Sequence, residues 1–358
     1  MPKNDLPSLL AGAERERSHS RFRQARALFV RASTAAEKAA DAARLAQALQ
    51  GAADCARLLG DFPAAVRDYT RALVAADPAE PALRADLACG RALAWRGAGE
   101  PRRALKGLEG ALAAYRKLGD REGQAFCLWA LGGAWRFAGD LTRALACLRL
   151  AGKAYARLGQ QEGLAYVHCA LGGVQRMRAR HADSLASYLK ANAAMRRRKD
   201  TFGTAYSYCG LGNAARMAGD LAKALAFFHK AEAVYARIGD RVSYAYTLWS
   251  MATAFKLQGR TAEAARAFSR AEALFRGTGD RRGLAYAAMG RAELAALAGR
   301  PGEARAALAT AGRLARGFAW ETRHVKALGA LLKGRSTYPA YAGSGSHFIP
   351  VALPVNWP

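Results

Sequence analysis

Acidic residues, aromatic residues and long uncharged stretches are all scarce in this 358-residue sequence. Asp and Glu number 28 against 55 Lys and Arg, which gives a formal net charge of +27, and aromatic residues make up only 9%. Charged residues recur throughout the helical part, so that no run there approaches the ~20 apolar residues that a membrane-spanning helix needs, and we expect no membrane insertion. The 52% of hydrophobic residues are enough for a buried core, which excludes a disordered chain.

Cysteine pairs and export signals are also lacking. The six cysteines form no C-x-x-C pair and lie in Ala- and Leu-rich helical patterns, where Cys acts as a small apolar residue. We expect reduced, buried thiols, although neighbouring repeats could bring Cys169 and Cys209 close together. The apolar stretch within residues 1–19 is too short for the core of a signal peptide. These features predict a cytoplasmic protein.

No catalytic or metal-binding pattern is present. The six histidines fall in different repeats or in the tails, and none belongs to an H-E-x-x-H or H-x-H motif. A phosphate-binding G-x-x-x-x-G-K-S/T loop and a G-x-S-x-G motif are both absent from the sequence. We therefore predict a protein that is not an enzyme and that has no catalytic residues, no metal and no small-molecule cofactor.

An internal repeat with a period of roughly 40 residues dominates what is present. Glycines recur at 99, 139, 219, 259 and 299, and Ala179 occupies the missing step. Half a repeat away, most members of a second series are Gly followed by Asp; the series is 119, 159, 199, 239 and 279. Gly supplies the left-handed residue that ends a helix, and Asp accepts N–H bonds at the start of the next one. Where Asp is absent, Pro101 and Pro301 stand at or near a first-turn position, where the missing N–H costs nothing.

Paired helices with a period in the range of roughly 20–50 residues indicate a solenoid, in which each repeat buries its apolar face against its neighbours. We predict an all-α fold of about seven antiparallel helix pairs. The predicted parts are an N-terminal tail (1–19), a capping helical region (20–48), the solenoid (49–316), a capping helix (317–335) and a Pro-rich apolar tail (336–358).

The repeat resembles the tetratricopeptide repeat (TPR) family. Leu131-Gly132, Leu171-Gly172 and Leu211-Gly212 match the Leu-Gly pair of its first helix. The second helix matches the Ala, aromatic, Ala pattern at Ala144 and Ala151, and the matching aromatic positions in later repeats are Tyr188, Phe228 and Phe268. The repeat is longer than the usual TPR unit of about 34 residues. In this it is similar to long-repeat members such as kinesin light chains and cell-polarity adaptors. The resemblance implies a right-handed superhelix and a protein-binding scaffold or adaptor.

Two stripes on the first helices are the candidate binding residues, because in the TPR family this side lines the concave groove. The tyrosine stripe occupies the second position of successive first helices: Phe126, Tyr166, Tyr206, Tyr246 and Tyr286. The cation stripe occupies the twelfth position: Arg96, Arg136, Arg176, Arg216 and Lys256. Trp129 and Trp249 stand at the fifth position, and Asn213 stands at the ninth.

A basic, aromatic-lined groove would bind an acidic or carboxylate-bearing peptide, because Arg donates forked hydrogen bonds and the aromatic rings give flat contact surfaces. Alternatively, the tyrosines only wedge adjacent repeats together and the Arg heads are solvated. The counterparts of Asn213 include Gly133, Gly173 and Thr253, so a chaperone-type carboxylate clamp is not supported.

Two further functions stay open. The charge of +27 allows RNA or DNA binding, with Tyr and Trp as stacking platforms. The tail 336–358 contains four prolines and no Asp, Glu, Lys or Arg, and it could dock in the chain's own groove or onto a partner. In the first case the protein would be a peptide-sensing regulator with a self-docked tail.

Overall fold

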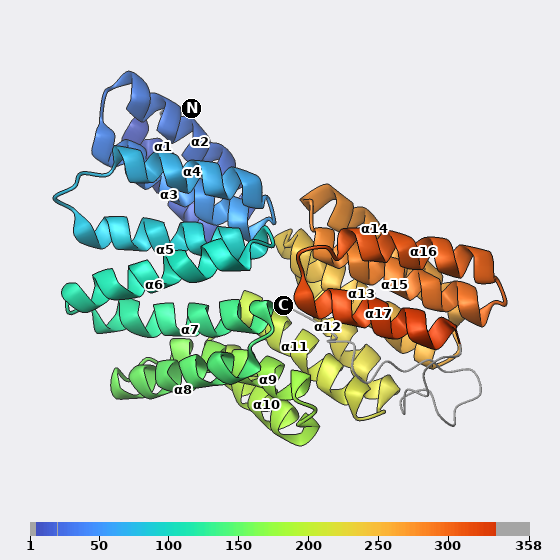
Figure 1. The fold of residues 1–358 in the computed structure, drawn as a ribbon. Helices are drawn as coiled ribbons and strands as arrows, with labels where there is room; N and C mark the ends of the chain where they lie inside the picture. The colour runs from blue at the N-terminus through green and yellow to red at the C-terminus, as the bar shows by residue number, and fades with distance from the viewer. Residues whose placement is uncertain (1–4, 20, 334–358) are drawn as a thin grey trace. The chain divides into compact units, whose positions relative to one another are not determined.

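The computed structural model describes residues 5–19 and 21–333, and every regular element within them is an α-helix (Figure 1). In chain order the helices are α1 (Leu6–Ser18), α2 (Phe22–Lys38), α3 (Ala42–Leu58), α4 (Phe62–Ala75), α5 (Pro81–Gly97), α6 (Pro101–Lys117), α7 (Arg121–Ala138), α8 (Leu141–Arg157), α9 (Gln161–Met177), α10 (His181–Arg197), α11 (Thr201–Met217), α12 (Leu221–Ile238), α13 (Arg241–Leu257), α14 (Thr261–Thr278), α15 (Arg281–Leu297), α16 (Pro301–Leu314) and α17 (Ala319–Leu332). The predicted all-α solenoid is confirmed, with seven helix pairs from α3 to α16.

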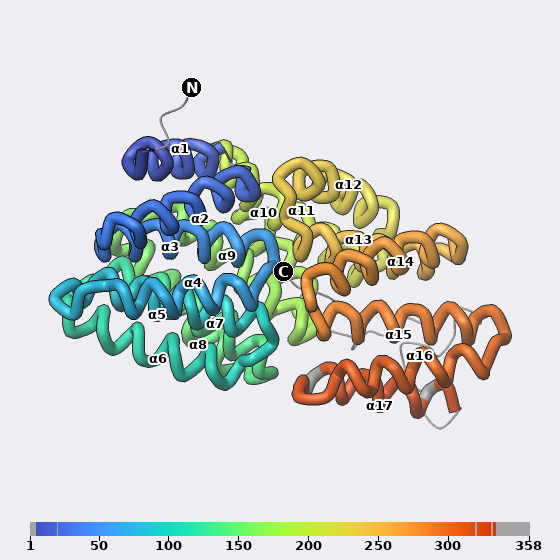
Figure 2. Tube along the Cα trace, turned by 90° about the horizontal axis from the view of Figure 1, so that it is seen from above, coloured from blue at the N-terminus to red at the C-terminus, as the bar shows by residue number. Residues whose placement is uncertain are grey.

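Consecutive helices pack against each other, as α3 does with α4 and α13 with α14, and both views of the chain show this (Figures 1 and 2). Small residues make the close approach possible. A Cβ atom at Gly212 of α11 would collide with the ring of Phe228 on α12, and the same holds for Gly132 and Leu148 in α7 and α8. These glycines belong to the Leu-Gly pairs that the sequence singled out, so their role is close helix packing.

The turns form as predicted. The glycines of both series that fall in the described turns adopt positive φ, for example 81° at Gly99 and 68° at Gly279. Asp200 and Asp280 then accept hydrogen bonds from the backbone N–H groups of Gly203 and Gly283, both at 2.8 Å. Gly therefore ends one helix and Asp starts the next.

Three non-glycine residues of the described chain adopt the left-handed turn conformation: Ala40, with a φ of 51°, and two members of the glycine series. Ala179 and Lys199 have φ of 58° and 57°. A residue with a Cβ is destabilised by roughly 1–2 kcal/mol in this conformation. Packing of the flanking helices therefore holds the turn even where the sequence departs from the glycine series.

Two compact units divide the chain. Of the described residues, unit 1 comprises those within 5–137, 142–163 and 237–240, and unit 2 comprises those within 138–141, 164–236 and 241–333. Each has its own buried clusters. Leu108, Tyr115 and Leu131 belong to one in unit 1, and Tyr188 and Leu211 to one in unit 2.

The sequence also led to expectations about the cysteines, membrane insertion and the C-terminal tail. All six cysteines are free thiols and five of them are buried, and the Sγ atoms of Cys89 and Cys127 lie 3.5 Å apart. None of the helices in 5–19 and 21–333 is long and apolar enough to cross a membrane. The tail 336–358 and its proposed docking lie outside the described residues. The handedness of the superhelix and the five predicted parts stay predictions.

Candidate functional site

The first helices of the repeats carry both predicted stripes. The cation stripe begins with Arg96 on α5 in unit 1, whose guanidinium lies 6.0 Å from the centre of the Trp129 ring on α7. Its Nη1 atom occupies the space that a Cβ atom of Gly133 would need. Gly133 is therefore required here for the close approach of a cation from the preceding repeat.

Arg216 is the most strongly perturbed member of the cation stripe. It lies on α11 in unit 2 with only 5% of its surface exposed, and its Nη2 atom donates to Asn213 Oδ1 at 3.4 Å. No residue in the described part of the chain accepts a bond from its buried Nε–H or forms an ion pair with it. Burial, followed by repulsion from Arg176, lowers the pKa of Arg216 to about 9.

Arg176 and Arg136 are likewise buried, at 4% and 5% exposure. The stripe was predicted either to bind a partner or to be solvated, and the structure excludes solvated heads at these three arginines. Asn213 lies close to Arg216 on α11, and its side-chain amide donates to the Cys209 carbonyl at 3.0 Å. The Asn213 side chain therefore accepts a hydrogen bond from Arg216 while its own amide group is held by the backbone of α11.

Lys256 ends the cation stripe in a different state. Its ammonium group bonds to Glu293 Oε2 at 2.5 Å, and the residue is only 2% exposed. Burial lowers the pKa of Lys256, while Glu293 opposes the change. The prediction of a cation on an open groove surface is therefore wrong for Lys256, because α15 supplies a carboxylate at the matching register.

The tyrosine stripe connects successive repeats of unit 2. Tyr166 donates to Asp200 Oδ2 at 2.9 Å, so its hydroxyl reaches the aspartate that starts the next first helix. Tyr246 bonds in the same way to Asp280, and Tyr286 donates to Glu321 Oε1 at 2.7 Å. This geometry agrees with the alternative in which the tyrosines wedge the repeats together.

The aromatic residues predicted to bind a partner differ in how exposed their side chains are. Tyr246, Tyr286 and Trp249 are buried, and the Trp249 ring lies 5.2 Å from that of Tyr286. The structure thus corrects the expectation that these three offer open contact surface. Tyr166, Tyr206 and Trp129 are half-buried, and Phe126 is 37% exposed.

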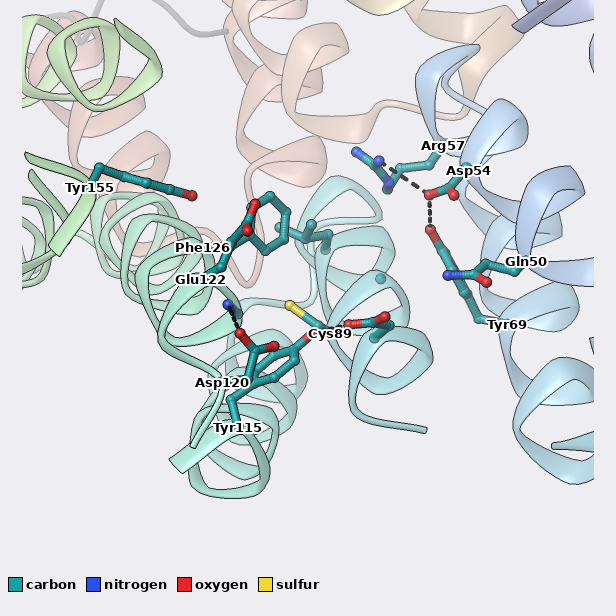
Figure 3. Close-up of a pocket in the computed structure, with 14 residues that line it drawn as sticks. Gln50, Asp54, Arg57, Tyr69, Cys89, Tyr115, Asp120, Glu122, Phe126 and Tyr155 are labelled. Carbon is teal, nitrogen blue, oxygen red and sulfur yellow. Dashed lines mark hydrogen bonds and ion pairs between the residues drawn. The ribbon is translucent and has the colours of Figure 1, made fainter. Parts of the chain in front are cut away.

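A pocket of about 380 Å³ lies within unit 1, beside Phe126 (Figure 3). It is lined by acidic and phenolic side chains from α3 to α8, and Arg57 is its one lining cation in the described residues. The lining includes Asp54, Asp86, Asp120, Glu122, Tyr69, Tyr115 and Tyr155. The pocket therefore has the opposite charge to the chain as a whole.

Hydrogen bonds inside the pocket are local. Tyr69 donates to Asp54 at 2.6 Å, and Tyr115 donates to Asp86 at 2.5 Å. Asp120 accepts the Gly123 N–H at 2.9 Å as the cap of α7. Desolvation raises the pKa of Asp86, and the carboxylates of Asp120 and Asp54 raise it further.

Four charged residues share the register of the predicted stripes, although the sequence analysis did not select them. Arg57 stands one repeat before Arg96, and Asp86 stands one repeat before Phe126. Asp54 and Glu293 correspond to the ninth position that Asn213 occupies. Extending each series to the first and last repeats would have found them. Their chemistry or spacing differs from that of the series, which is why a search for like residues missed them.

The comparisons with known proteins agree with this architecture. Residues 201–277 match the sequence model described as tetratricopeptide repeat. Among curated proteins, none matches the sequence. A Rap protein complexed with Competence and Sporulation Factor is similar in structure, with a TM-score of 0.65 at 13% identity over 92% of this chain and 99% of that one.

Two other solved structures show the same fold. The Rap conjugation gene regulator of plasmid pLS20 in complex with the Phr* peptide has a TM-score of 0.62 at 15% identity, covering 79% of this chain and 78% of its own. The Cut9-Hcn1 hetero-tetramer of APC/C has a TM-score of 0.62 at 15% identity, covering 90% and 55%. At these identities the likeness concerns the fold. The chain therefore contains tetratricopeptide repeats, matched in sequence at 201–277, and folds as a solenoid of the TPR type.

Proposed function

We propose that the protein is a non-enzymatic scaffold that binds a peptide or protein, and that unit 2 receives a carboxylate of an acidic partner at Arg216 and Arg176. The observation that carries the proposal is the state of Arg216. It is a buried guanidinium with an Nε–H that no described residue accepts, beside a second arginine.

Burying a cation without a counter-ion is costly, and an anion at this place would offset that cost. A carboxylate fits because a guanidinium donates two parallel N–H bonds to its two oxygens. The contrast with Lys256 supports this assignment. There Glu293, on the next first helix, already supplies the carboxylate from within the chain. The residue at the equivalent place for Arg216 is Thr253, so the next first helix offers Arg216 no carboxylate.

The similar structures support the class of partner. Two of them are Rap proteins, one complexed with Competence and Sporulation Factor and one with the Phr* peptide, and they share the repeat fold with this chain. A helical-repeat fold offers extended surfaces for such partners.

The test is fluorescence anisotropy with two labelled probes at ~150 mM salt, near physiological ionic strength. One probe is the peptide Gly-Ser-Asp-Glu-Asp, and the other is a uridine oligonucleotide of equal negative charge. We expect Arg216→Gln to weaken peptide binding by about tenfold, the loss typical of a buried charged contact.

Arg197→Gln is the matched control, because it removes the same charge from the exposed end of α10. It should leave peptide binding within about twofold of wild type, as for an exposed charge. Equal losses in both variants would mean that overall charge alone attracts the peptide. Tighter binding of the oligonucleotide, with no effect of Arg216→Gln, would replace the proposal with nucleic-acid binding.

A further inference from the structure

The pocket of unit 1 holds a tyrosine hydroxyl to which the fold gives no hydrogen-bond partner. Tyr155 on α8 lines the pocket and is only 6% exposed. Within the described chain its hydroxyl makes no hydrogen bond. Figure 3 shows this hydroxyl pointing toward the side where Glu122 and Phe126 lie. Polar groups on buried side chains are usually hydrogen-bonded, so this hydroxyl is available to a polar group that enters the pocket.

The preceding repeat shows why the partner is missing. Tyr115 stands one repeat before Tyr155, and it donates to Asp86. The residue one repeat after Asp86 is Phe126, which has no acceptor to offer. The ring of Tyr155 is nonetheless held in place, because it packs where a Cβ atom of Gly163 would otherwise lie. The hydroxyl is thus fixed at the pocket with no bond to the fold.

Two of the carboxylates that line the pocket, Asp86 and Glu122, lack cations of their own. Asp86 has Tyr115 as its hydrogen-bond donor, and the charges that act on it most strongly are the like charges of Asp120 and Asp54. Glu122 makes no ion pair with any described residue. Arg57 is engaged with Asp54 at 3.5 Å. The Asp86 and Glu122 side of the pocket therefore has uncompensated negative charge in a chain that is strongly basic overall.

We propose that this pocket binds the guanidinium group of an arginine side chain presented by a peptide partner. Asp86 and Glu122 would accept its N–H bonds, and the Tyr155 hydroxyl would serve as a further acceptor. The exposed ring of Phe126 offers a flat face on which a guanidinium stacks. A volume of about 380 Å³ suits a single long side chain and its hydrogen-bonding head.

A guanidinium fits better than an ammonium group. Its plane can stack on Phe126 while its five N–H donors reach acceptors on more than one side, whereas an ammonium is a compact point charge. The inference rests on residues of unit 1 alone. It shares with the proposed function only the class of partner, because the acidic partner is assigned to Arg216 and Arg176 in unit 2.

The test uses the full chain and saturation-transfer NMR with two small probes. They are acetyl-Ala-Arg-Ala-amide and the same peptide with citrulline, which has the shape of arginine without its charge. We expect the arginine peptide to bind wild type, and Asp86→Asn to weaken it by about tenfold, as for a lost hydrogen bond to a charged group. Phe126→Ala should also weaken it, since the stacking face is removed.

Glu109→Gln is the matched control, because it removes a carboxylate from the exposed surface of α6 outside the pocket. It should leave binding unchanged, as should Arg216→Gln in unit 2. Equal binding of the citrulline peptide, or equal losses in Asp86→Asn and Glu109→Gln, would overturn the proposal. Thermal melts by circular dichroism confirm that each variant is folded. If wild type binds the arginine peptide but not the acidic peptide, only the function proposed for unit 2 is contradicted.

Discussion

Units 1 and 2 place opposite chemistry at equivalent positions of the same repeat. In unit 2, Tyr166 donates to Asp200, the aspartate that caps the next first helix. In unit 1 the equivalent pair is Asp86 and Asp120, two carboxylates that repel each other; burial raises the pKa of Asp86, and the charge of Asp120 raises it further. One substitution in the tyrosine stripe therefore turns a contact between repeats into one wall of an acidic pocket.

The difference shows how a solenoid acquires distinct sites on a uniform backbone. Each repeat packs mainly against its neighbours, so one position can change without disturbing distant repeats. In unit 2 the ninth position also varies between repeats. Thr253 leaves Arg216 without a carboxylate from the next first helix, whereas Glu293, one repeat later, neutralises Lys256. The positions that pack are repeated, and the positions that differ carry the candidate sites.

Removing the internal counter-ion of Lys256 should have the largest effect on stability. Glu293→Gln leaves a buried ammonium without a carboxylate, and breaking a buried pair in this way costs about 3–5 kcal/mol. Urea denaturation measures the loss. Arg216→Gln should cost little or even stabilise unit 2, because it removes a buried charge that has no internal counter-ion.

Glu303→Gln is the control for that comparison. It breaks an exposed pair with Arg300 on α16, where N···O is 3.0 Å, and should cost no more than about 1 kcal/mol. If Glu293→Gln lowered the free energy of unfolding no more than Glu303→Gln does, the distinction between Lys256, which has an internal counter-ion, and Arg216, which has none, would be contradicted.

Acid should weaken the last helix of unit 2 next most strongly. Burial lowers the pKa of His324 on α17 to about 4, from an ordinary value of 6.5. Between these two pH values the His324 ring is protonated in the unfolded chain but stays neutral in the folded chain. Stability contributed by the neutral ring is complete above pH 6.5 and falls as the pH drops toward 4, by about 3 kcal/mol in all.

Hydrogen exchange of the α17 amides between pH 7 and 4.5 follows this loss, after correction for the intrinsic pH dependence of exchange. The pocket of unit 1 should respond in the opposite direction. The raised pKa of Asp86 means that protonation favours the folded state there, so acid relieves its repulsion. His324→Asn should flatten the pH response of α17. A response that persists in His324→Asn would assign it to another group.

The turns give the smallest effect. Ala179→Gly in unit 2 should stabilise the chain by about 1 kcal/mol, because glycine removes the strain of a left-handed residue. Gly159→Ala in unit 1 is the reverse change at a φ of 68° where a Cβ would meet nothing, so it should destabilise by a similar amount. Thermal melts measure both. Changes of the same sign would show that backbone strain does not decide these turns.

The sequence predicted the repeat, the helix pairs and the turn chemistry, because Gly, Asp and Ala act locally at fixed spacing. It also placed the two stripes in register. It did not predict that Arg216 would be buried, since burial depends on how closely neighbouring first helices pack. The acidic pocket escaped notice because Asp86 stands one repeat before the aromatic series and does not share its chemistry. A site made by a departure from the repeat gives no periodic signal.

The central claim is that unit 1 and unit 2 bind opposite charges independently. A cross-titration tests it most directly: wild type, Asp86→Asn and Arg216→Gln are each measured with acetyl-Ala-Arg-Ala-amide and with Gly-Ser-Asp-Glu-Asp. The account predicts that Asp86→Asn loses about tenfold for the arginine peptide alone and Arg216→Gln about tenfold for the acidic peptide alone. The claim would be contradicted if either variant lost affinity for both peptides, or if neither variant lost affinity for any peptide.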